Sequence, residues 1–86
     1  MISHEIQHDQ QTQCFTLSVE GKEARLDYRL ASSEQPPVIN FTHTFVPADY
    51  RGKGYAEHLV RYALKWAREQ GYNIQASCWY VSKFLR

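Results

Sequence analysis

The stretch Phe45–Ala56 reads FVPADYRGKGYA, and it joins an apolar run that predicts a β-strand to a long amphipathic run that predicts a helix. It contains two glycines, Gly52 and Gly54, and two cations, Arg51 and Lys53. Backbone N–H groups in the first turn of a helix have no intrahelical acceptor, and the helix dipole adds partial positive charge there. Glycine lets the oxygens of a ligand approach the backbone closely. We therefore predict that this loop binds the phosphates of a cofactor.

Two familiar glycine motifs are absent. The dinucleotide-binding pattern G-x-G-x-x-G fails because Glu57 stands where its third glycine would be, and the chain has no G-x-x-x-x-G-K-[ST] segment. The pattern that is present is R-x-x-G-x-A, over Arg51–Ala56. A purely structural interpretation is also open, in which the glycines only permit a tight turn between strand and helix. The two cations and the strand-to-helix setting favour the phosphate interpretation.

The N-terminal half of the chain predicts antiparallel strands. Alternating apolar residues indicate a hairpin over Cys14–Leu30, with Glu20–Gly21 as its turn. Ile2–Asp9 is predicted to be an edge strand or an extended arm. Val38–Val46 is the clearest strand, and strict alternation places four residues on one of its faces, namely Ile39, Phe41, His43 and Phe45.

The C-terminal half predicts a crossover. An apolar stripe indicates a helix over about Gly54–Gln70, and Gly71 is a natural residue to end it. Tyr72–Cys78 follows as a strand, so that strand, helix and strand form a βαβ unit with parallel strands. Trp79–Arg86 is predicted to form a terminal helical turn. The fold class is thus α/β (α+β), with a mostly antiparallel sheet and one crossover.

Length and charge limit the functional classes. The 86 residues predict a single domain over residues 1–86, and the net charge of +1 argues against a general nucleic-acid binder. Cys14 and Cys78 form neither a disulfide framework nor a metal pattern, and His4, His8 and His58 are predicted to lie on the surface. Without a signal peptide or an apolar run of about 18 residues, we expect a cytoplasmic protein that does not enter membranes.

Three segments resemble the small single-domain GNAT acetyltransferases: His43–Pro47, Tyr50–Ala56 and Cys78–Val81. The resemblance covers nearly the whole chain and implies a minimal GNAT-like fold without the usual N-terminal helices. It also implies that acetyl-coenzyme A lies where the two parallel strands splay apart. The pantetheine arm would pair with the backbone near Phe45 and Val46. The pyrophosphate would contact the segment from Arg51 to Ala56, which contains Gly52, Lys53, Gly54 and Tyr55.

The resemblance places three candidate catalytic residues at this splay. Cys78 is a nucleophile that accepts the acetyl group, or it shapes the acetyl pocket while the acceptor amine attacks directly, or it packs as a small apolar residue. His43 is a general base or a positioning residue, or a buried histidine satisfied by hydrogen bonds. Tyr80 protonates the departing coenzyme thiolate, or it only packs its ring.

These features predict an acetyl-CoA-dependent N-acetyltransferase. The acceptor is an unidentified amine, either a small molecule or a protein lysine, and the short chain implies an open acceptor side. The alternative is a non-catalytic module that binds or senses acyl-coenzyme A. A small nucleic-acid module using Arg51, Lys53 and Arg61 is a third interpretation, and the near-zero net charge weakens it.

Overall fold

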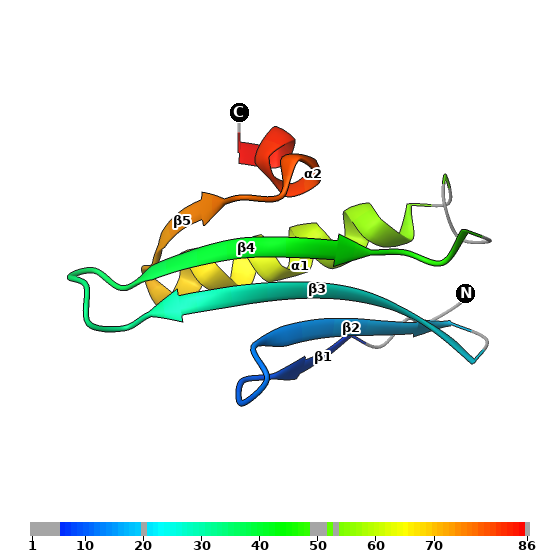
Figure 1. Ribbon diagram of the computed structural model, residues 1–86, viewed down its shortest axis with the longest axis horizontal. Coiled ribbons are helices and arrows are strands. Elements are labelled where there is room, and N and C mark those ends of the chain that lie inside the picture. Colours follow the sequence, from blue (N-terminus) through cyan, green and yellow to red (C-terminus); the bar gives the residue numbers. More distant parts are fainter. Residues whose placement is uncertain (1–5, 20, 49–51, 53, 86) are drawn as a thin grey trace.

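The computed structural model describes residues 6–19, 21–48, 52 and 54–85. In these residues five strands form one sheet in the order β1-β2-β3-β4-β5, accompanied by helices α1 and α2 and the 3₁₀ turn η2 (Figure 1). The bounds are β1 Ile6–Asp9, β2 Cys14–Val19, β3 Lys22–Ala31, β4 Val38–Phe45, α1 Tyr55–Gln70, β5 Asn73–Ala76, α2 Trp79–Ser82 and η2 Lys83–Leu85. Strands β1 to β4 pair antiparallel, and β4 pairs with β5 in parallel. The predicted mixed α/β fold class is confirmed.

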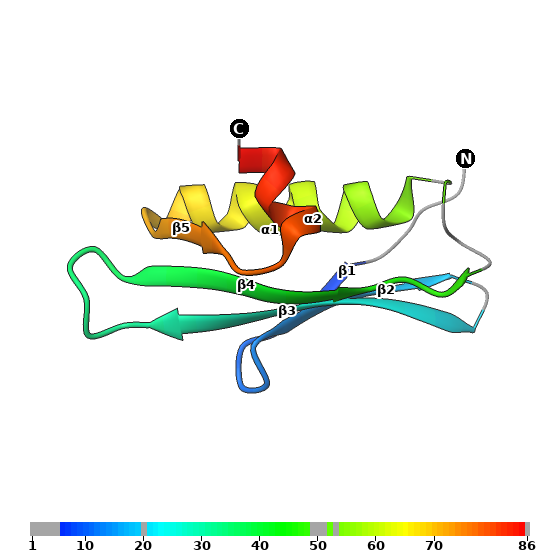
Figure 2. The ribbon, with the colours of Figure 1, turned by 45° about the horizontal axis from the view of Figure 1, so that its top comes forward.

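Helix α1 covers one face of the sheet, as Figure 2 shows. Its apolar stripe is fully or almost fully buried, and each such side chain larger than alanine contributes about 1.5–3 kcal/mol to folding. The stripe consists of Leu59, Val60, Ala63, Leu64 and Ala67. Gly71 ends the helix in a left-handed conformation, as predicted, and its N–H donates to the Arg68 carbonyl. No helix in the described residues is long and apolar enough to span a lipid bilayer.

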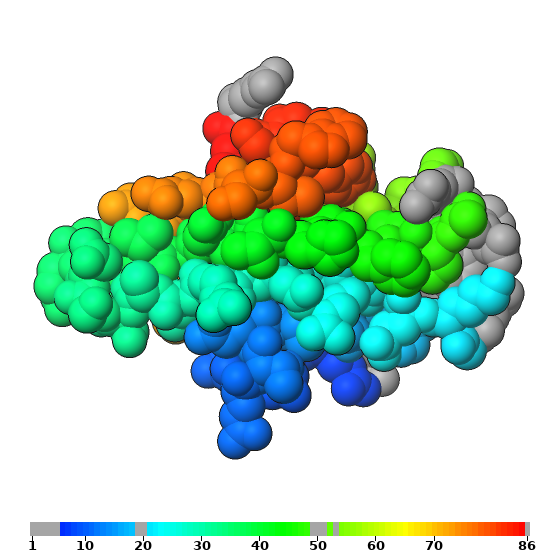
Figure 3. All heavy atoms as spheres, viewed as in Figure 1, coloured from blue at the N-terminus to red at the C-terminus, as the bar shows by residue number. Residues whose placement is uncertain are grey.

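The opposite face of the sheet is open. In Figure 3 the atoms of β3 and β4 lie side by side on this face, with no described helix over them. Residues that pair across β3 and β4 share a face, and on the open face these include Asp27 with His43 and Arg25 with Phe45. The phenyl ring of Phe45 is 51% exposed there. The sheet therefore has one face for the core and one face for solvent.

Strand β4 contains an extra residue, Thr42. Asp27 pairs with His43 but the next residue, Tyr28, pairs with Phe41, so Thr42 has no partner of its own on β3. Such a bulge shifts the alternation of side chains by one residue. Phe41 is therefore buried under α1, whereas His43 and Phe45 turn to the open face. The prediction that all four alternating residues share one face is wrong beyond the bulge.

The prediction that His8 lies on the surface is also wrong. Its ring stacks on Phe15 at a centroid distance of 4.0 Å and meets the edge of Trp66 at 4.5 Å. Burial raises the pKa of Tyr28 to about 12, so that its hydroxyl keeps its proton, and this hydroxyl forms a 2.6 Å hydrogen bond with Nε2 of His8. Burial likewise lowers the pKa of His8, against an opposing effect of Asp9. The neutral imidazole is thus part of the packing that holds the edge strand β1.

We predict that acid weakens the fold through His8. Because the folded-state pKa of His8 lies below its ordinary value of 6.5, the unfolded chain is protonated first as the pH falls. The free energy of unfolding should therefore decrease from about pH 6.5 downward until the pH passes the lowered folded-state value. Urea unfolding of His8→Gln, which does not titrate, should lack this decrease. His58→Gln, at an exposed position on α1, is the control and should keep the wild-type slope. An unchanged slope in His8→Gln would contradict the prediction.

Candidate functional site

The parallel pairing of β4 and β5 ends early and leaves a pocket. Pairing covers only Val38–Phe41 of β4 and Asn73–Ala76 of β5. Beyond it, β4 continues to Phe45, whereas the segment after β5 turns into α2. The space between them has a volume of about 650 Å³. Three segments line it: Thr44 and Val46 from the end of β4, then Gly52, Gly54, Ala56 and Glu57 at the start of α1, and finally Cys78, Trp79 and Tyr80 at the start of α2. The described residues thus form the splay that the sequence implied.

The glycine loop forms one end of this pocket. Gly52 and Gly54 adopt left-handed backbone angles, with φ of 81° and 82°, which favour glycine. A methyl group at either position would meet no atom within 4 Å, so a ligand can reach the backbone. Gly54 precedes α1 without a side chain that caps its first-turn N–H groups. These features fit the binding of an anion such as a phosphate.

The remaining predicted cofactor-binding residues divide into three groups. Val46 and Ala56 line the pocket. Tyr55 and Phe45 do not: the Tyr55 side chain packs partly buried against the core, and that of Phe45 lies on the open face, so that only backbone groups of Phe45 could reach a ligand. The two predicted cations, Arg51 and Lys53, lie outside the described residues.

Cys78 lies at the other end of the pocket. Its sulfur is 3.5 Å from the Thr44 hydroxyl oxygen. Burial raises the pKa of the Cys78 thiol, but the Thr44 hydroxyl and backbone groups of Val81 and Tyr80 lower it by more, so the pKa falls below its ordinary value. Cys14, by contrast, is buried at 6% exposure on β2, outside the pocket lining. Of the two thiols, Cys78 has the environment that favours a reactive thiolate.

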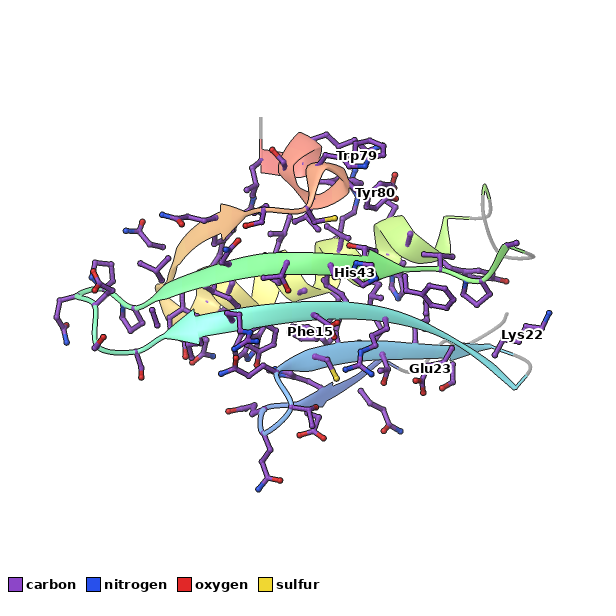
Figure 4. All side chains as sticks on the ribbon, viewed as in Figure 1. Phe15, Lys22, Glu23, His43, Trp79 and Tyr80 are labelled. Carbon is purple, nitrogen blue, oxygen red and sulfur yellow. The ribbon has the colours of Figure 1, made fainter. Side chains whose placement is uncertain are left out.

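Tyr80 and Trp79 form the α2 wall of the pocket, and Figure 4 shows them close together beside β4. Burial, with a further contribution from the Glu57 carboxylate, raises the pKa of Tyr80. The phenol therefore keeps its proton at neutral pH and can donate it. The Trp79 side chain is 75% exposed at the rim, so it is available to an incoming ligand.

His43 lies apart from this group. It is exposed and pairs with Asp27 across the open face of the sheet, and it is absent from the described lining of the pocket. Its label in Figure 4 lies on β4, near the end of the strand. The structure thus brings Cys78 and Tyr80 together but leaves His43 on the other side of β4. A role for His43 as a base stays a prediction.

A family model described as GCN5-related N-acetyl-transferase matches residues 14–86. The chain belongs to this family. Among similar proteins, Protein NATD1 of Bos taurus is 32% identical over 83 residues, which is 94% of this chain and 71% of that protein. Protein NATD1 of Gallus gallus is 31% identical over 84 residues, covering 95% and 74%, and that of Homo sapiens is 31% identical over 83 residues, covering 94% and 71%. The family resemblance seen in the three sequence segments is confirmed.

Three residues of this GNAT pocket escaped the sequence analysis. Thr44 follows His43 directly, but uninterrupted alternation assigned it to the wrong side of the strand. Glu57 and Trp79 adjoin predicted site residues, and only the packing of α2 beside α1 shows that both face the same space. Among the described residues, no three His, Cys, Asp or Glu side chains gather in a way that could hold a metal ion.

We predict that the Thr44 hydroxyl keeps the thiol of this GNAT domain acidic. Thr44→Val keeps the shape of the side chain but removes its donor, so the pKa of Cys78 should rise. The measurement is the pH dependence of thiolate absorbance, with a Cys78→Ala spectrum subtracted. Thr16→Val, on β2 away from the pocket, is the matched control. A Cys78 pKa that is the same in wild type and Thr44→Val would refute this role.

Proposed function

We propose that the chain binds acetyl-coenzyme A in the splay pocket and transfers the acetyl group to an amine. The single observation that supports this most is that one pocket is lined both by the glycine loop, whose backbone is open to a ligand, and by Cys78, whose thiol has a lowered pKa. In acetyl-coenzyme A, the pantetheine arm joins the pyrophosphate at one end to the acetyl thioester at the other. Membership of the GCN5-related family gives the proposal independent support.

Different segments of the chain are proposed to bind the pyrophosphate and the pantetheine arm of acetyl-coenzyme A. Gly52, Gly54 and the first turn of α1 hold the pyrophosphate through backbone N–H groups. The backbone of Phe45 and Val46, beyond the last pairing of β4 with β5, is placed to bond the pantetheine arm. Acetyl-coenzyme A supplies an acyl group already activated as a thioester. Arg51 and Lys53 are proposed to add charge to the phosphate end.

Cys78 offers two routes for the transfer. In the first, its thiolate attacks the acyl carbon, so that a bond to Sγ forms as the bond to the coenzyme sulfur breaks. The acceptor amine then forms the C–N bond and releases Cys78. In the second, the amine attacks directly and Cys78 only shapes the acetyl pocket. In both routes Tyr80, which stays protonated, gives its proton to the departing thiolate.

The acceptor is proposed to approach from the open face of the sheet. No described helix covers this face, and His43 is exposed on it one residue before Thr44. We propose that His43, exposed on this face, takes a proton from the amine before the amine reaches the pocket side of β4. An open approach favours a large or protruding amine such as a protein lysine. Faster acetylation of free small amines than of lysine peptides would count against this choice.

The alternative is a module that binds or senses acyl-coenzyme A without turnover. The observation that favours it is the absence of His43 from the described pocket lining, so that the predicted histidine base does not lie beside Cys78. This alternative keeps the glycine loop and its anion but assigns no chemistry to Cys78 or Tyr80.

The first test is calorimetric titration of acetyl-coenzyme A into wild type and Gly54→Glu. A glutamate at Gly54 blocks the open backbone and repels phosphate, so binding should weaken by more than about tenfold, or about 1.4 kcal/mol. Gly71→Glu is the matched control, because Gly71 has the same left-handed backbone at the opposite end of α1. Absence of binding by wild type would refute the cofactor. Equal weakening in both variants would show that backbone strain, and not the loop, is responsible.

The second test separates chemistry from binding. Tyr80→Phe and Cys78→Ala should bind acetyl-coenzyme A much as wild type does, but release coenzyme A to a lysine peptide at least about 100-fold more slowly. Tyr62→Phe, on the exposed side of α1, is the control and should transfer normally. Normal transfer by both site variants would remove these residues from the mechanism. Tight binding with no transfer by wild type to any amine would favour the sensing module.

A further inference from the structure

The point at which β5 leaves β4 is held by a side chain of β4. The Oδ1 atom of Asn40 accepts the Ser77 N–H at 2.9 Å, and its Nδ2 donates to the Ser77 hydroxyl oxygen at 3.0 Å. The same hydroxyl lies 3.3 Å from Oδ1. Asn40 therefore contacts both the backbone and the side chain of Ser77, the residue before Cys78.

The backbone turns at this contact. Ser77 N–H and Cys78 N–H both donate to the Phe41 carbonyl, at 3.0 and 3.2 Å. In a regular parallel ladder successive residues of one strand do not share one acceptor, because their N–H groups point to opposite sides. Two consecutive donors on one carbonyl mean that the strand has ended and the chain bends. The bend makes Cys78 the residue that precedes α2, with its sulfur toward Thr44.

We propose that Asn40 is a positioning residue for Cys78. Its amide fixes Ser77 at the bend and thereby sets where the Cys78 sulfur lies relative to the Thr44 hydroxyl and the first turn of α2. This inference deepens the proposed function, since a transfer site at Cys78 is what the positioning serves. Asn40 is not among the described residues that line the pocket, and its side-chain hydrogen bonds go to Ser77, so the proposed effect on Cys78 is transmitted through Ser77.

The hydrogen bonds between Asn40 and Ser77 are not needed to satisfy buried polar groups. The contacts lie at an exposed position, where water would satisfy the polar groups of Ser77 if Asn40 were absent. Hydrogen bonds that water can replace contribute little to folding. Loss of the Asn40–Ser77 hydrogen bonds should therefore leave the domain folded. The backbone at the bend, and the Cys78 sulfur that follows it, should then be less fixed in position.

The test compares Asn40→Leu, which removes every contact to Ser77, with Asn40→Asp, whose carboxylate still accepts from the Ser77 N–H and hydroxyl. The first readout is the pH profile of Cys78 alkylation by iodoacetamide, followed on the Cys78 peptide by mass spectrometry. Asn40→Leu should move this profile to higher pH. The second readout is acetyl transfer, in which kcat should fall about 10- to 100-fold while KM for acetyl-coenzyme A stays nearly constant. Asn40→Asp should restore both readouts at high salt, which screens its added charge.

Gln75→Leu is the matched control. Gln75 is the exposed β5 residue paired with Asn40, and the same amide is lost there without any contact to Ser77. It should behave as wild type. The proposal is overturned if folded Asn40→Leu keeps the wild-type alkylation profile and kcat, if Gln75→Leu matches its effect, or if Asn40→Asp fails to restore Cys78 reactivity.

Two further arms keep the test decisive. If Asn40→Leu fails to fold, Ser77→Ala removes the hydroxyl half of the contact and should shift the alkylation profile in the same direction by a smaller amount, and no shift would overturn the proposal. Alkylation needs no acetyl-coenzyme A, so a wild type that cannot bind this ligand refutes the proposed function while the alkylation series still decides the role of Asn40.

Discussion

The extra residue at Thr42 determines which side chains reach the pocket. A regular β4 would continue the alternation of Phe41 and would turn His43 and Phe45 toward α1. The bulge instead turns Thr44 and Val46 to the α1 side, where both line the pocket and Thr44 meets Cys78. The same shift leaves His43 and Phe45 on the open face. One inserted residue thus separates the side chains that line the pocket from those that lie on the open face, where the acceptor is proposed to approach.

Two groups in the pocket, Cys78 and Tyr80, change their acidity in opposite directions, although both are partly buried. Burial disfavours the anion of Cys78 and of Tyr80 alike. The Thr44 hydroxyl and backbone groups around α2 lower the pKa of Cys78 by more than burial raises it. The Glu57 carboxylate raises the pKa of Tyr80 further. The result is a thiol that ionises more readily beside a phenol that keeps its proton. Divergent acidities of neighbouring groups are what acid–base chemistry requires.

Local sequence patterns predicted the parts of this fold whose cause is local. Period-two and period-3.6 alternation located the hairpin, β4 and α1, and the glycines located the loop before α1. The bulge at Thr42 left no such signal, because its cause lies in the pairing with β3, a different part of the chain. His8 was misplaced for a similar reason, since its ring partner Trp66 and its hydrogen-bond partner Tyr28 are distant in sequence. Pattern alone cannot show contacts between segments that become neighbours only on folding.

Helix α1 supplies buried side chains to the core, and its first turn forms part of the pocket lining. Leu59 and Val60, one turn from Gly54, are fully buried against the sheet, so the first turn of the helix cannot move independently of the core. Packing of α1 on the sheet therefore also fixes the first turn, to which the phosphate is proposed to bind. A ligand that binds at this first turn only in the native state would raise the free energy of unfolding with the logarithm of its concentration. In a chain of 86 residues with a limited core, the proposed ligand binding and the folding both depend on the packing of α1 on the sheet.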